Sequence, residues 1–152
     1  MQPKPIAAIV ILSLVVASLL ASGCTSNQTN QAQNAQVSVS AQYQGSYTPT
    51  LPDTPDPLSG YQYVKFYVTV KNLNETGVNY LGDPFDFIVV DTNNQSYNAT
   101  AITTDPSDAI KVIRNSRPGD TTAGSLAFEV KQGFTPQKLV YNDGFNNVTV
   151  TF

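Results

Sequence analysis

Aspartates are the side chains of this sequence that could perform acid–base chemistry, because the chain has no histidine. Asp83, Asp86 and Asp91 flank one expected strand, and six further aspartates fall in expected turns or loops: Asp53, Asp56, Asp105, Asp108, Asp120 and Asp143. A glycosidase needs two carboxyl groups about 5–10 Å apart in a cleft, and the spacing indicates no such convergence. Turn aspartates usually bind nearby backbone N–H groups. We therefore expect local structural roles, with a loop calcium site as the weaker alternative.

The remaining composition excludes most catalytic and metal chemistry. Without histidine and with one cysteine, the chain cannot form a His-based triad, a His or Cys zinc site, a thiol redox pair or an internal disulfide. It also lacks a Gly-rich phosphate loop, Ser-x-x-Lys and Gly-x-Ser-x-Gly. We expect a non-enzymatic protein with no metal and no cofactor.

Four residues of one expected strand form a candidate ligand face. Tyr61, Tyr63, Lys65 and Tyr67 alternate with apolar residues, so they should share the outward face and could bind sugars or polypeptide. Tyrosine also simply suits strands, and the neighbouring proline-rich segment 45–60 could cover the rings. Both interpretations stay open at this stage.

Three basic residues form a second candidate, a docking loop. Lys111, Arg114 and Arg117 gather positive charge within one expected loop of an otherwise acidic domain, which could suit an acidic surface partner. The alternative is an ordinary solvated loop that Ile110 and Ile113 attach to the domain.

Five sequons meet the Asn-x-Ser/Thr rule for N-glycosylation. They begin at Asn27, Asn74, Asn94, Asn98 and Asn147, all in the expected tether or near turns. Their use depends on the glycosylation machinery of the organism.

The overall charge argues against phosphate-rich partners. Charged residues make up 12% of the chain, against about 25% in typical domains. After residue 23 the chain has seven basic and eleven acidic side chains, a net charge of −4. Nucleic-acid binding needs a basic surface, so we expect no nucleic-acid partner. Polarity carried by Tyr, Thr, Asn and Gln is typical of an extracellular surface.

The first 24 residues read as an export signal. Lys4 precedes an apolar run over 6–20, and small residues follow before Cys24, which describes a signal peptide over 1–23. Residues 19–24 resemble a prokaryotic lipoprotein lipobox, which implies cleavage before Cys24 and a lipid on it. The alternative is an uncleaved signal anchor. Either way we expect the protein on the outer face of the cytoplasmic membrane or the cell surface.

Composition divides the rest of the chain into a tether and one domain. Residues 24–36 contain no large apolar side chain, so nothing offsets the entropy of ordering them and we expect a flexible tether. Residues 37–152 suffice for one domain. Within them, segment 45–60 has four prolines, which exclude a central strand or helix. We expect it to cap the domain, with Leu51 and Leu58 making apolar contacts.

The domain reads as a series of short strands. The central one is 61–72, where Val64, Phe66, Val68 and Val70 should face the core. Other strands are expected over 37–43, 78–81, 85–90 with Phe85 inward, 96–101, 121–130, 139–141 and 145–152. Asp105 could cap one helical turn over 108–113, and Asn142-Asp143-Gly144 predicts a tight hairpin turn. This pattern predicts an all-β, antiparallel β-sandwich of seven or eight strands.

Several motifs of the domain share one pattern of strands and turns: Gly60, Val64–Asn72, Phe87–Asp91, Tyr97, Pro118–Asp120 and Gly124–Val130. Together they resemble the DUF4352 group of immunoglobulin-like domains, common on bacterial and archaeal surface lipoproteins. The resemblance spans roughly 36–152 and departs from the group in segments 45–60 and 103–117. It implies an immunoglobulin-like fold and a surface location, and no activity.

Three functions remain open, in order of preference. The first is a lipid-anchored surface protein that presents an immunoglobulin-like domain for protein interaction or adhesion in the envelope. The second is a glycan- or small-molecule-binding lipoprotein, such as a transporter accessory, which a deep pocket with converging polar groups would favour. The third is a hydrolase, which close carboxylates with raised pKa values in a pocket would favour.

Overall fold

Strand β3 (Tyr61–Asn72) is the middle strand of one antiparallel sheet. It pairs with β2 (Val37–Tyr47) on one side and β8 (Thr121–Lys131) on the other. The computed structural model describes residues 28–30, 36–50, 54–100 and 107–152. The predicted inward set of β3, Val64, Phe66, Val68 and Val70, is fully buried. The alternating apolar pattern therefore located the centre of the core correctly.

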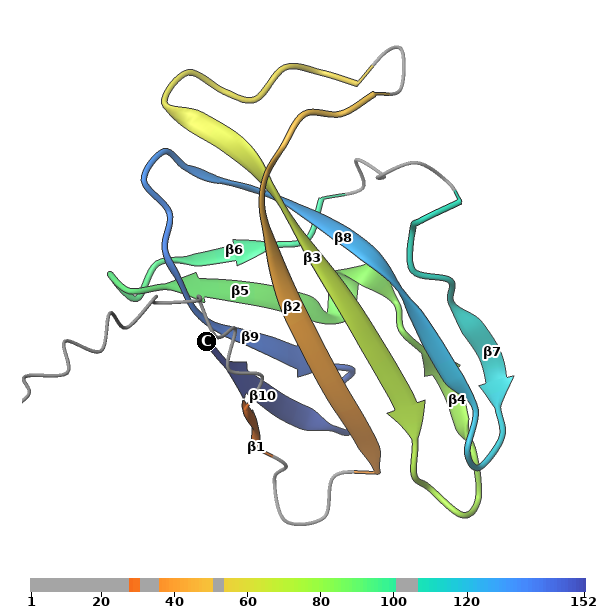
Figure 1. Cartoon of the computed structure of the whole chain (residues 1–152). Coiled ribbons are helices and arrows are strands. Elements are labelled where there is room, and N and C mark those ends of the chain that lie inside the picture. Colours follow the sequence, from red (N-terminus) through yellow and green to blue (C-terminus); the bar gives the residue numbers. More distant parts are fainter. Residues whose placement is uncertain (1–27, 31–35, 51–53, 101–106) are drawn as a thin grey trace, which may run out of the picture.

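A second antiparallel sheet packs behind the first, and its strands cross those of the front sheet (Figure 1). Phe87, Leu139, Tyr141, Val148 and Val150 of this sheet are fully buried with the apolar side chains of β2, β3 and β8. Its strands, in spatial order, are β1 (Gln28–Asn30), β10 (Asn147–Thr151), β9 (Pro136–Asn142), β5 (Phe87–Asp91) and β6 (Ser96–Asn98). The predicted all-β, immunoglobulin-like sandwich is confirmed.

A two-stranded ribbon of β4 (Val78–Leu81) and β7 (Ile113–Ser116) lies beside β8 (Figure 1). The predicted helical turn over 108–113 is wrong. Ala109 instead forms a parallel bridge with Ser125, and Ile110 is buried in the core. A Cβ at Gly124 would overlap the backbone of Ile110. Tertiary contacts across a glycine therefore determine this segment, and they override the local capping signal.

The strand that was predicted to begin at residue 85 begins at Phe87 instead. Pro84–Asp86 forms a short 3-10 helix, in which the Asp83 side chain accepts a hydrogen bond from the Phe85 N–H at 3.0 Å. Phe85 was predicted to face the core, but its side chain is 70% exposed. The capping aspartate and Pro84 favour a helical turn over an extended chain here.

The predicted hairpin at 142–144 is confirmed, but its connection is longer than the tight turn that was expected. The connection between β9 and β10 covers residues 143–146, and the Asp143 carboxylate accepts hydrogen bonds from the N–H groups of Phe145 and Asn146. Gly144 has a positive φ of 84°. Phe145, predicted to begin a strand, is 92% exposed.

One short piece of the predicted tether is ordered as a strand. Gln28–Asn30 pairs antiparallel with β10, in register with Thr149–Thr151. An edge strand offers unpaired backbone groups, so pairing there needs no large apolar side chain. This corrects the expectation of flexibility for these three residues. The signal peptide 1–23, Cys24 and residues 31–35 lie outside the described residues.

The described part of the chain contains no helix long and apolar enough to cross a membrane.

Candidate functional site

The predicted tyrosine face does not form one exposed surface. Tyr63 is only 3% exposed, and its hydroxyl donates a hydrogen bond to the Pro55 carbonyl oxygen at 3.2 Å. Tyr61 packs against the core, which leaves Tyr67 as the exposed ring of the three. The proline-rich segment therefore covers part of β3, as the alternative interpretation predicted. Leu58 does not contribute the expected apolar contact, because it is 65% exposed.

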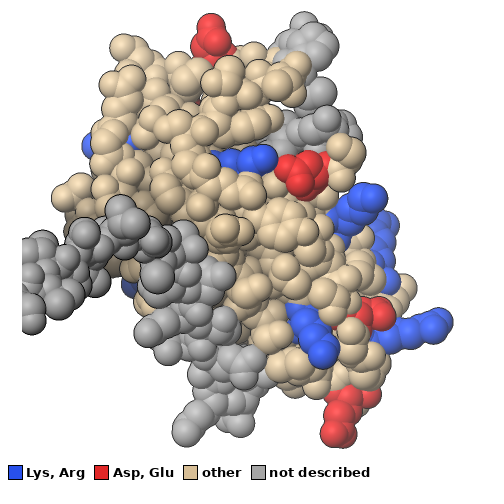
Figure 2. Space-filling view, in the orientation of Figure 1, with Lys and Arg blue, Asp and Glu red and all other residues tan. Residues whose placement is uncertain are grey.

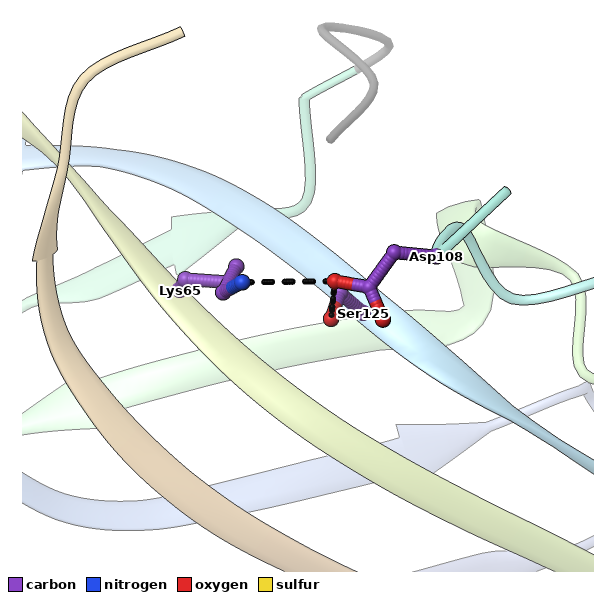
Figure 3. Close-up of polar contacts among 3 residues, drawn as sticks. All are labelled: Lys65, Asp108 and Ser125. Atoms are coloured by element: carbon purple, nitrogen blue, oxygen red, sulfur yellow. Dashed lines mark hydrogen bonds and ion pairs between the residues drawn. The ribbon is translucent and has the colours of Figure 1, made fainter. Parts of the chain in front are cut away.

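Lys65, the fourth residue of that face, belongs to a polar staple that also contains Asp108 and Ser125 (Figure 3). Asp108 Oδ2 lies 3.2 Å from Lys65 Nζ and accepts a hydrogen bond from Ser125 Oγ at 2.7 Å. The staple joins β3, β8 and the segment that precedes β7. Ser125 is buried and its hydroxyl donates to a carboxylate already paired with Lys65. This arrangement holds the segment in place and does not activate the hydroxyl.

The predicted docking loop is largely a strand. Arg114 lies on β7, Lys111 precedes it, Arg117 follows it, and all three are exposed. Figure 2 shows basic side chains gathered along the side of the molecule where β7 lies. Ile110 is buried and Ile113 packs against the core, as predicted. Docking at this basic edge stays a prediction.

The described sequons differ in accessibility. Asn94, Asn98 and Asn147 are exposed. Asn74 is half-buried, and its Nδ2 donates hydrogen bonds to Gln36 Oε1 at 2.8 Å and to the Gly77 carbonyl oxygen at 3.0 Å. A glycan on Asn74 would have to break this turn. Asn27 lies outside the described residues.

A cleft of about 430 Å³ lies where three connections of the sandwich meet. One wall comes from β4 and the turn that follows it, another from the β9–β10 connection, and a third from the turn after β3. Its lining residues are Gln36, Asn74, Gly77, Val78, Tyr80, Asp83, Asp86, Asp143, Phe145 and Asn146. The prediction that the aspartates do not converge is therefore wrong.

Two copies of one local pattern contribute to the lining of the cleft. In Asp83-Pro84-Phe85 and Asp143-Gly144-Phe145, the carboxylate accepts a hydrogen bond from the phenylalanine N–H two residues later. Each turn leaves its phenylalanine exposed, Phe85 at 70% and Phe145 at 92%. The repeated Asp-x-Phe pattern is the sequence signal that could have identified this site.

Asp86 differs from the other two aspartates of the cleft because its carboxyl group caps none of the described turns. Among the described residues its side chain has no hydrogen-bond partner, whereas Asp83 and Asp143 each cap a turn. Burial, followed by the neighbouring charges of Asp83 and Asp143, raises the pKa of Asp86 to about 6. Among the described residues, no lysine or arginine lines the cleft. The described part of the cleft is therefore a negatively charged surface without a basic side chain to neutralise it.

Within the part of the chain that the structure describes, no group of three or more His, Cys, Asp or Glu side chains could hold a metal ion.

Comparison with known proteins identifies the fold. A family model described as Domain of unknown function (DUF4352) matches residues 24–149. The secreted protein MPT63 of Mycobacterium tuberculosis is 21% identical with a TM-score of 0.52, covering 80% of this chain and 88% of its own. A predicted lipoprotein of Bacillus subtilis, ycdA, is 20% identical with a TM-score of 0.56, covering 82% of this chain and 38% of its own. No curated protein matches in sequence.

Proposed function

This chain belongs to the DUF4352 family, a domain of unknown function, and we propose that it is a lipid-anchored, non-enzymatic surface protein. It binds another polypeptide in the cell envelope. The binding surface is the cleft lined by Tyr80, Asp83, Asp86, Asp143 and Phe145.

The exposure of large aromatic side chains at one place carries this proposal. Tyr80 is 55% exposed, and Phe85 and Phe145 are more exposed still. All three lie on the segments that form the cleft. Grouped exposed apolar side chains mark interaction sites, and aromatic residues dominate the energetics of protein interfaces. The sandwich does not need these rings for its core, so a partner is the best account of their position.

The anchor is supported by the N-terminal sequence and by the extent of the family match. The match begins at Cys24, the only cysteine of the chain and the residue that follows the expected signal peptide. Two lipid chains hold a protein stably on a bilayer, at about 0.8 kcal/mol per buried methylene. Cys24→Ser should leave the protein unlipidated and either soluble or unprocessed in a detergent-partitioning assay. Full membrane retention of the processed variant would contradict the anchor.

A glycan- or small-molecule-binding role is the second candidate, because the volume and aromatic rim of the cleft also suit a small ligand. The raised pKa of Asp86 beside other carboxylates likewise meets one requirement for a hydrolase. Asp83 and Asp143, however, already use carboxylate oxygens to cap turns. Among the described residues, Asp86 is then the one carboxyl group of the three that caps no turn, whereas a glycosidase needs two free carboxyl groups, which favours the polypeptide.

Site-specific photo-crosslinking in intact cells tests the polypeptide proposal. A photo-reactive amino acid replaces Phe145 in one strain and Leu58, exposed in the proline-rich segment, in a matched control. We expect a discrete protein adduct from position 145 and none from position 58. Equal labelling from both positions, or glycan adducts alone at position 145, would overturn the proposal.

A further inference from the structure

We infer that the cleft takes a basic segment of its partner, with a lysine or arginine side chain placed among Asp83, Asp86 and Asp143 and with neighbouring apolar side chains on Tyr80 and Phe145. This inference rests on the proposed function and specifies its ligand. The occupant is a polypeptide that carries positive charge next to apolar residues.

Charge complementarity is the first argument. Three carboxylates line the cleft, and none of the described basic residues does. Among the described residues, the ion pair of the structure joins Lys65 and Asp108, neither of which lines the cleft. Like charges held together repel, and a complementary charge on a partner relieves that repulsion and steers association. The cleft therefore selects a cation over a neutral or an acidic group.

The hydrogen bonds within the cleft leave its negative charge unneutralised. Asp83 Oδ1 accepts from the Phe85 N–H, and Asp143 accepts from the backbone and side chain of Asn146. Their donors are neutral amide N–H groups, so these bonds leave the negative charge of both carboxylates in place. Asp86 can then form the direct contact, while Asp83 and Asp143 contribute their field.

The exposed aromatic rings indicate a polypeptide ligand, because they offer apolar surface beside the carboxylates. An isolated ammonium ion would not need Tyr80 and Phe145, which are 55% and 92% exposed. Lysine and arginine carry long apolar stems below their charge, and their cations also bind favourably over aromatic faces. A basic segment with apolar neighbours therefore uses both the charge and the rings of the cleft.

Binding should also depend on pH. The groups that act on Asp86 are the carboxylates of Asp83 and Asp143, and Tyr141 lies near enough for Asp86 to raise its pKa. Because the pKa of Asp86 is about 6, the carboxyl is largely protonated at pH 5 and ionised at pH 7. A cationic segment should therefore bind more weakly at pH 5.

The test uses the full-length lipoprotein in neutral detergent and two fluorescent probes, an acetylated pentapeptide of alternating leucine and lysine and its counterpart with glutamine in place of lysine. By fluorescence anisotropy at pH 7, we expect the lysine peptide to bind at least about tenfold more tightly. Asp86→Asn should lower its affinity several-fold and Phe145→Ser should do the same. Asp56→Asn, an exposed aspartate outside the cleft, is the matched control and should change nothing.

The outcomes separate this inference from the proposed function. Equal binding of the glutamine peptide would overturn the charge selection and leave a neutral polypeptide as the ligand. No binding of either peptide, or an Asp56→Asn effect as large as that of Asp86→Asn, would overturn the inference. The crosslinks from position 145 report on the proposed function independently, because they require no assumption about charge.

Discussion

Strand β5 has an aspartate at each end, and the fold treats the two carboxylates in opposite ways. At the closed end, formed by turns 91–95 and 132–135, Asp91 is buried and accepts hydrogen bonds from the N–H groups of Asn93 and Gln95, each at 2.8 Å. The bond from Gln95 is the largest cause that lowers the pKa of Asp91. At the open end, formed by turns 83–86 and 143–146, burial and like charges raise the pKa of Asp86.

The phenylalanines of the two ends differ in the same way. Phe134 is 8% exposed, and its ring centroid lies 5.7 Å from that of Tyr97 and 6.1 Å from that of Tyr43. Phe145 is 92% exposed. The closed end thus satisfies its charge and buries its ring within the chain. The open end leaves the Asp86 carboxyl group unpaired among the described residues and the Phe145 ring exposed, which is the arrangement expected of a ligand site.

The largest expected difference in stability lies between the truncations of these two phenylalanine rings. Phe134→Ala should lower the free energy of unfolding by about 3–4 kcal/mol, because it leaves a cavity among buried aromatic rings. Phe145→Ala should change it by less than about 0.5 kcal/mol, because the ring is exposed. Urea denaturation measures both. A large loss for Phe145→Ala would show that this ring serves the fold.

Asp91→Ala should have the next largest effect, a fall of several degrees in the thermal midpoint, because the N–H groups of Asn93 and Gln95 and the Tyr97 hydroxyl lose their acceptor. The folded pKa of Asp91 lies below its unfolded value. The stabilisation is therefore present above the unfolded pKa and is lost as pH falls through the folded pKa. Thermal denaturation from pH 7 to pH 2 checks this, and a wild-type advantage that persists at the acidic limit would contradict it.

Sequence patterns predicted the closed end and the core well. Alternation gave the inward residues of β3, and the turn-forming run 91–95 was predicted as a turn. These features depend on neighbours in sequence, so local rules suffice for them. Burial of Asp91 required tertiary packing and could not be read from the turn.

The candidate site was harder to predict because it depends on distant segments. Asp86 and Asp143 are far apart in sequence, and β9 places them together by pairing with both β5 and β10. Residues 85–86 of the turn at 83–86 were predicted to begin a strand because Phe85, Phe87 and Val89 alternate. The N–H group that Asp83 captures decides otherwise. Similarly, Lys65 left the predicted ligand face because segment 107–110 brings Asp108 to it.

At the open end we expect a smaller change in the free energy of unfolding, and it should be a gain instead of a loss. Asp86→Asn should raise the free energy of unfolding at pH 7 by roughly 0.5–1 kcal/mol, a value reduced for partial solvation. The folded pKa of about 6 lies above the unfolded value, so ionisation destabilises the fold as pH rises from about 4 to 6. The gain should thus vanish near pH 4. Asp83→Asn is the control, and it should not stabilise because Asp83 caps a turn.

The smallest change in stability is expected at the Lys65–Asp108 ion pair, where the aspartate already has a cationic partner. Lys65→Met should cost less than about 1 kcal/mol, because both side chains of the Lys65–Asp108 pair are partly exposed. Denaturant titrations at low and high salt measure this cost. A loss of several kcal/mol that shrinks at high salt would show that the staple, and not only the open end, contributes strongly to the electrostatics of the fold.

The most direct test of the central claim is a ¹³C NMR pH titration of the Asp86 carboxyl, without and with the lysine peptide. The claim is that the fold holds this charge unpaired for a cationic partner. We expect a pKa of about 6 in the free protein and a marked fall when the peptide saturates the cleft. An ordinary value near 4 in the free protein, unchanged by the peptide, would contradict it.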